Sequence, residues 1–211
     1  MLLNTERLPL FILASIVLLL TPGPAVLYII ARSLDQGRMA GIVSVMSVEV
    51  GNFFHAVAAA LGLSALLLSS ATAFSVVKYL GAAYLVYLGL RKLFSKSVSV
   101  TETSQEPQSL RRIFSQGVTV AVLNPKTALF FLAFLPQFVD RSRGQVALQL
   151  LTLGCLFVLM AIVSDGMYAL LASSAGQWLK SRQKIWLFER YGVGLIYIGL
   201  GITAALADKP H

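Results

Sequence analysis

Six apolar segments with few charged residues occupy most of this chain. Apolar residues make up 57% of the sequence and charged residues 12%, whereas soluble domains have roughly 45–50% apolar and about 25% charged residues. Most of the segments reach the roughly 20 residues that a helix needs to cross a bilayer. Inside a bilayer the backbone must satisfy its own hydrogen bonds, as helices do, so the sequence predicts an all-α, polytopic bundle of membrane helices. The segments span residues 8–31, 40–68, 73–90, 113–135, 146–171 and 187–207.

Two proline motifs interrupt the first and the fourth segment. A helix broken inside the bilayer survives only where the break is buried in protein or lines a cavity, and such breaks form binding sites in many transporters. At 1.5 Å per residue the breaks lie about 15 Å and about 21 Å from the basic ends of their segments, which is near the middle of a hydrocarbon core about 30 Å thick. We therefore predict a broken first helix in each half of the chain. The motifs are Thr21-Pro22-Gly23-Pro24 and Asn124-Pro125-Lys126.

Each break is expected to expose the start of a half-helix. Thr21 and Asn124 are residue types that cap helix N-termini, and proline suits the first helical position. Where two such N-termini converge, their unpaired N–H groups and partial positive charge favour an anionic ligand, and Lys126 adds a full positive charge. The alternative is that the prolines merely kink two membrane helices. The predicted substrate-binding residues are Pro22, Gly23, Pro24, Asn52, Asn124, Pro125 and Lys126.

Glu49, Lys126 and Asp165 are ionisable residues deep within apolar segments. A charge at that depth costs from a few to more than about 10 kcal/mol, so such groups face one another or water. Loss of hydration favours the neutral form of a carboxyl group, and a carboxyl group that exchanges its proton can couple transport to protons. We predict a proton-coupling role for Glu49, Asp165 and His55, which continues a polar stripe from Glu49. The alternatives are neutral carboxyl groups that hydrogen-bond between helices and a histidine that only packs.

Basic residues are concentrated in the turns that follow the first, third and fifth segments. Lys and Arg accumulate in cytoplasmic loops, so if all six segments span, these turns are cytoplasmic and both termini lie outside. The net charge of +8 therefore orients the chain and requires no nucleic-acid partner. The residues in these turns are Arg32, Arg38, Arg91, Lys92, Lys96, Arg111, Arg112, Lys180, Arg182, Lys184 and Arg190.

A polar tract separates the two groups of three segments. The composition of residues 95–110 disfavours a packed core, which predicts a cytoplasmic linker between a first three-helix repeat, residues 1–94, and a second, residues 111–211. Three spans on each side of the linker would give the two repeats inverted orientations. A competing topology folds the first segment back at its proline motif as a re-entrant hairpin, which leaves five spans and a cytoplasmic N-terminus. The basic-residue distribution is compatible with both.

Several stretches together resemble the LysE/RhtB family of amino-acid exporters, over nearly the whole chain. The resemblance implies a multi-pass protein of the bacterial inner membrane that exports amino acids or related metabolites, in exchange for entering protons. By position it extends to both proline motifs, whereas Ala25 and Ser47 depart from the common family pattern. The stretches are residues 21–24 with Ala31 and Arg32, residues 51–55, 81–89, 124–126 and 130–138, and the glycine-rich residues 192–201.

Two other functions are compatible with parts of the sequence. Paired half-helices also build water and solute channels, but the chain has no second Asn-Pro motif. An intramembrane enzyme could use Ser64 with His55 as base, yet these residues are about 13 Å apart along one helix, too far for the hydrogen bond that activates a nucleophile. We expect no enzyme activity, no cofactor and no metal site. The expected partners are an amino-acid substrate, protons and the lipid bilayer, and the sequence is compatible with a homo-oligomer.

Overall fold

The structure, a computed structural model, describes Leu3, residues 6–63 and 108–174, and the helical positions 76, 79, 83, 86, 87, 90, 198 and 202. All regular structure among these residues is helical, as predicted. The third and sixth predicted segments and residues 95–107 of the linker fall largely outside the described ranges. The six-span inverted repeat and the three-part division of the chain therefore stay predictions.

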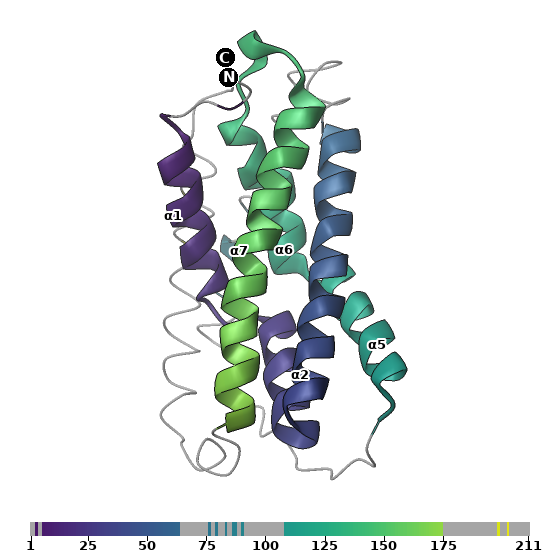
Figure 1. Cartoon of the computed structure of the whole chain (residues 1–211). Coiled ribbons are helices and arrows are strands. Elements are labelled where there is room, and N and C mark those ends of the chain that lie inside the picture. The colour runs from purple at the N-terminus through teal and green to yellow at the C-terminus, as the bar shows by residue number, and fades with distance from the viewer. Residues whose placement is uncertain are drawn as a thin grey trace.

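The described elements form an upright bundle in which α2 lies between α7 and α5 (Figure 1). Val146–Ser174 is long and apolar enough to cross a membrane, and so is the bent pair Leu110–Val122 and Pro125–Phe138, taken as one span with a bend of 42°. The helices are α1 (Leu8–Leu19), α2 (Pro24–Ala58), the π-helical η1 (Ala59–Leu63), α5 (Leu110–Val122), α6 (Pro125–Leu129), the π-helical η2 (Phe130–Phe134), the 3-10 helices η3 (Leu135–Phe138) and η4 (Arg141–Arg143), and α7 (Val146–Ser174).

Element α2 consists of two antiparallel arms joined at Gly37. Gly37 has φ 80° and ψ −169°, a conformation that glycine adopts without steric cost. A Cβ atom on Gly41 would collide with the side chain of Ser33, which shows that the arms touch on either side of the reversal. The stretch Pro24–Leu63 would be about 60 Å long as a straight helix, twice the hydrocarbon thickness. Its first arm, residues 24–36, continues the first broken helix, and its second arm, residues 38–63, covers most of the second predicted segment.

Both predicted breaks are present. The first separates α1 from the first arm of α2, and the second separates α5 from α6. In Figure 1 the chain runs down through α1 and the first arm of α2, returns upward through the second arm, and later runs upward through α5 and α6. The two broken helices are thus antiparallel.

The first segment does not fold back at its proline motif. Helix α1 packs against α7 and η3 rather than along α2, and the reversal occurs at Gly37. The re-entrant alternative is therefore wrong for the described residues. The start of α1 lies at the upper end of Figure 1, and the start of α5 lies at its lower end. Which end faces the cytoplasm stays a prediction.

The prediction that Thr21 caps the half-helix after the first break is wrong. The N-cap is Gly23, without a side-chain hydrogen bond, because the helix begins at Pro24 and the cap is the residue before it. The Thr21 hydroxyl instead donates to the carbonyl of Val17, at 2.7 Å. Asn124 does cap the second half-helix, since its side chain accepts from the N–H of Lys126 at 3.1 Å.

Two apolar clusters fill the interior above and below the breaks. The aromatic cluster, on the side of α1 and η3, contains six phenylalanines. The centroids of neighbouring rings lie between 5.0 and 6.3 Å apart. The small-residue cluster, on the side of the Gly37 turn, contains mostly Ala and Val. The members of the first are Phe11, Phe130, Phe131, Phe134, Phe138 and Phe157, and those of the second are Ala25, Ile29, Val45, Val48, Ala121 and Ala169.

Candidate functional site

A cavity of about 20 Å³ lies where the two helix breaks meet. It lies between the two clusters, since Phe157 of the aromatic cluster and Ala25 and Val48 of the small-residue cluster all contribute to its wall. A water-sized molecule needs roughly 10–15 Å³ of such volume, so the cavity has room for about one. The described residues that line it are Leu18, Leu19, Gly23, Ala25, Val26, Val48, Asn52, Asn124, Lys126, Thr127, Phe157 and Asp165.

Lys126 connects the two breaks. It is the second residue of α6 and only 6% of its surface is exposed. Its ammonium donates a hydrogen bond to the backbone carbonyl of Thr21, in the first break, and is also close enough to Asp165 for electrostatic attraction. A buried ammonium requires such partners, because its loss of hydration is otherwise uncompensated.

Glu49 and Asp165 form a carboxyl pair between the second arm of α2 and α7. Their exposed fractions are 4% and 3%, and their side chains are within hydrogen-bonding contact. The amide of Asn52 donates to Oε2 of Glu49 at 3.0 Å. Oε1 of Glu49, Oδ1 of Asp165 and Oδ1 of Asn52 are buried without a hydrogen-bond donor. Two carboxyl groups in contact can satisfy each other only by sharing a proton, because an ionised carboxylate is an acceptor only.

Asn124 and Thr127 complete the polar wall at the second break. The Asn124 carbonyl oxygen accepts from the Lys126 N–H, and its amide donates to the Thr127 hydroxyl at 3.1 Å. The N–H of Lys126 and the hydroxyl of Thr127, both at the start of this half-helix, are thus already hydrogen-bonded within the protein. The corresponding start in the first break, at Gly23, has no side-chain cap.

Apart from His55, the predicted residues divide into three groups. Gly23, Asn52, Asn124, Lys126 and Asp165 line the cavity together. Glu49 is behind that wall, bonded to Asn52. Two of the predicted prolines, Pro24 and Pro125, start helices at the breaks. The third, Pro22, lies within the first break.

His55 is placed apart from the cavity. Its Nε2 lies 3.1 Å from the carbonyl oxygen of Ala121, near the end of α5, and its ring stacks on Phe131 with centroids 6.1 Å apart. Its proton-coupling role stays a prediction that these contacts do not support.

Sequence reasoning missed two polar contributors. Thr127 lies three residues after the Asn124 cap, a spacing at which a hydroxyl can reach the cap side chain. Tyr168 lies in the apolar fifth segment, and its hydroxyl donates to the carbonyl of Leu20 in the first break at 2.9 Å. The signal was available, because a tyrosine hydroxyl in an apolar segment normally finds a hydrogen-bond partner.

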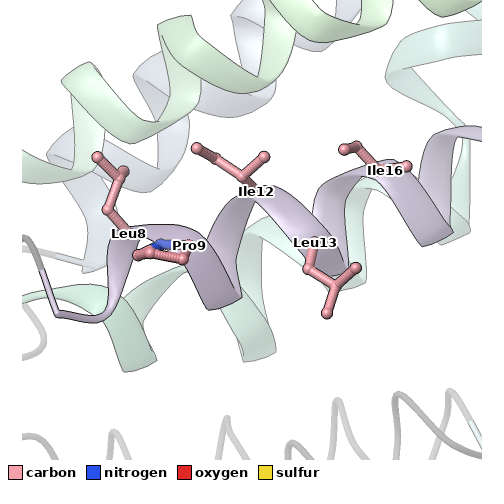
Figure 2. Close-up of a pocket in the computed structure, with 5 residues that line it drawn as sticks. All are labelled: Leu8, Pro9, Ile12, Leu13 and Ile16. Carbon is pink, nitrogen blue, oxygen red and sulfur yellow. The ribbon is translucent and has the colours of Figure 1, made fainter.

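A second cavity, of about 370 Å³, lies along α1. Figure 2 shows its described lining, in which Leu8, Ile12 and Ile16 point to one side of the helix and Leu13 to the other, with Pro9 completing the set. Because these side chains are all apolar, the described part of its wall offers no group that would bind a charged ligand. Among the described residues, moreover, no cluster of His, Cys, Asp or Glu could hold a metal ion.

Comparison with known proteins identifies the family. Residues 16–207 match the LysE type translocators. The chain belongs to this family. Related LysE-type proteins include an uncharacterized membrane protein, YrhP, of Bacillus subtilis, which is 30% identical over 90% of this chain and 94% of its own length. The homoserine/homoserine lactone efflux protein of Salmonella typhimurium is 30% identical over 95% of this chain and 96% of its own length.

An uncharacterized membrane protein of Vibrio cholerae is similar to the same degree, with 30% identity over 93% of this chain. No solved structure matches this LysE-type translocator. The family and the apolar helices point to a membrane transport protein.

Proposed function

We propose that this translocator is a secondary active exporter of amino acids or closely related metabolites across the bacterial inner membrane, driven by entering protons. The observation that carries the proposal is the joint burial of Lys126 and the carboxyl pair of Glu49 and Asp165 around one cavity. An amino acid carries a carboxylate and an ammonium group, and the site offers a partner of opposite charge to each. The family match and the efflux relatives support outward transport of small molecules.

The substrate carboxylate would bind Lys126 and the uncapped start of α2 at Gly23. Both groups face the cavity, and the start of a helix favours an anion. Because the Lys126 ammonium is bonded to the Thr21 carbonyl here, substrate binding would exchange that acceptor for the carboxylate. The substrate ammonium would then bind Asp165, which also lines the cavity.

Proton exchange would take place at the carboxyl pair. A proton shared by Glu49 and Asp165 satisfies two buried oxygens that otherwise have no donor. An arriving substrate ammonium supplies donors to Asp165, so the shared proton is no longer needed there and can leave through Glu49. The carboxyl pair thereby holds either a proton or the substrate ammonium group, which is what the exchange of substrate for protons requires.

A cavity of about 20 Å³ is too small for an amino acid, because it has room for only about one water-sized molecule. Substrate binding therefore requires one of the two apolar clusters to part. Opening of the small-residue cluster would admit substrate from the cytoplasm, and opening of the aromatic cluster would release it outside. This arrangement favours a carrier that alternates between two facing states over an open channel.

Reconstitution into proteoliposomes tests the proposal. A panel of labelled amino acids is measured for exchange and for uphill movement under an imposed proton gradient. We expect saturable flux. Glu49→Gln should retain exchange but lose gradient-driven accumulation, whereas Asp165→Asn should lose both. Glu6→Gln and Asp35→Asn are matched controls on exposed carboxylates and should behave as the native protein. Flux that does not saturate and never runs uphill would indicate a channel, and flux indifferent to both carboxyl variants would overturn the proposed site.

A further inference from the structure

A proline at the first position of a half-helix has a consequence for the backbone before it. In a continuous helix each carbonyl accepts from the N–H four residues later, and proline has no N–H to donate. Pro24 therefore leaves the carbonyl of Leu20 without that donor, and Pro125 does the same to the carbonyl of Ala121. Within a bilayer no water replaces the lost bond.

The Leu20 carbonyl is satisfied from the second half of the chain, residues 108–174. The hydroxyl of Tyr168, on α7, donates to it at 2.9 Å. The next carbonyl, that of Thr21, also accepts from the second half, through Lys126.

The Ala121 carbonyl is satisfied from the first half, residues 6–63. It keeps a short local bond from the N–H of Asn124, at 3.0 Å, and its second acceptor position faces Nε2 of His55 at 3.1 Å. A carbonyl can only accept, so this ring nitrogen must carry the hydrogen. The stacking of the ring on Phe131 holds the donor in that direction.

We propose that His55 and Tyr168 are positioning residues that cap the two carbonyls freed by the helix-initial prolines, each from the opposite half, and thereby hold the breaks in their closed arrangement. The caps cross between the halves, so the halves cannot move apart at the breaks without exposing a carbonyl to lipid or to the cavity. Opening of the site therefore requires both caps to be released or replaced. The inference concerns the conformational equilibrium and does not depend on the identity of the substrate.

A cysteine reporter measures this equilibrium without any transport assay. The native cysteine, Cys155, is replaced by alanine, and Ala25→Cys places a thiol in the cavity wall. Ala25 is only 6% exposed, so a maleimide reacts there only when the site opens. The rate of labelling in membranes then reports the open population.

Removal of the tyrosine cap is tested with Tyr168→Phe. Because a typical hydrogen bond changes an equilibrium by roughly fivefold, we expect labelling to be on the order of fivefold faster. The matched control is Tyr28→Phe, which also deletes a phenol that donates to a carbonyl, that of Ile113 at 2.6 Å. Ile113 lies in the first turn of α5, away from both breaks, so labelling should change less than about twofold. Equal acceleration by both variants would overturn the inference.

Removal of the histidine cap uses two substitutions. His55→Leu deletes the donor, and labelling should be on the order of fivefold faster, whereas His55→Gln places an amide N–H at a similar reach and should restore the native rate. The double variant His55→Leu with Tyr168→Phe should show roughly the product of the single effects, because the caps lie at separate breaks.

A second readout separates the cap from the predicted proton-coupling role of His55. Glutamine does not titrate, so if His55 were a proton carrier, His55→Gln would abolish the response of flux to a proton gradient. We expect His55→Gln to retain that response. Loss of the response, or labelling of the His55→Gln variant as fast as that of the His55→Leu variant, would overturn the proposed capping role of His55.

Discussion

The ammonium of Lys126 and the backbone carbonyl of Thr21 are hydrogen-bonded to each other, although more than a hundred residues separate them in the sequence. The bond joins the second helix break to the first. The residue that we propose to bind the substrate carboxylate therefore also links the two breaks when the site is closed.

Lys126→Ala should lower the rate of amino-acid efflux more than about tenfold, because the substrate loses its only positively charged partner among the described cavity residues. Lys126→Arg should also be impaired, since the larger guanidinium exceeds a cavity of about 20 Å³. Initial efflux rates from proteoliposomes measure both effects. Arg38→Ala removes an exposed basic residue near the Gly37 turn and serves as the control, with a change of less than about twofold. Native efflux in Lys126→Ala would contradict the prediction.

Gly51→Ala should destabilise the protein by about 1–3 kcal/mol, as overpacked interfaces do. A Cβ atom there would collide with that of Ala121 and lie 3.2 Å from backbone atoms of Val118 and Val122, so α2 and α5 would have to separate. Thermal unfolding in detergent measures the change. Gly62→Ala is the matched control, because a Cβ at Gly62 meets nothing within 4 Å, and its melting temperature should equal or exceed the native value.

Gln149→Ala should lower stability by about 3 kcal/mol, or roughly 6–12 °C in melting temperature. The fully buried Gln149 side chain accepts from the N–H of Asp140 at 2.9 Å and donates to the carbonyls of Asp140 and Gly144 at 2.8 and 2.7 Å. These bonds fix the turn before α7. Thr152→Val, which removes an exposed local hydroxyl bond, should change the melting temperature by less than about 2 °C. A small effect of Gln149→Ala would show that the turn does not depend on this side chain.

Asp140 should make the same turn sensitive to acid. Hydrogen bonds from Ser142 and then from Arg143 lower the pKa of this carboxyl group below its usual value. A folded pKa below the unfolded one contributes stability that is present above the unfolded pKa and is lost as pH falls through the folded pKa. Asp140→Asn should therefore melt at a lower temperature than the native protein at pH 7, and the difference should disappear once the pH falls below the lowered pKa of Asp140 in the folded protein. Melting curves across this range measure it, and a difference that persists there would contradict the assignment.

The sequence by itself determined the features that depend on local chemistry. Apolar segments of about bilayer length predicted helices, because a helix makes all of its backbone hydrogen bonds within one segment, and the described helices agree. The missing N–H of Pro24 and Pro125 predicted both breaks, and the side chain of Asn124 predicted its own cap, since each effect acts within a few residues of the chain.

Only the tertiary structure decided which distant groups meet at the breaks. Thr21 was expected to cap a helix, but its hydroxyl bonds back to Val17 and its carbonyl accepts from Lys126. The pairing of Glu49 with Asp165 and the contact of Tyr168 with Leu20 depend on how α7 rotates and rises against α1 and α2. Such contacts are not encoded in local spacing, because they result from packing of whole helix faces whose positions many side chains set together.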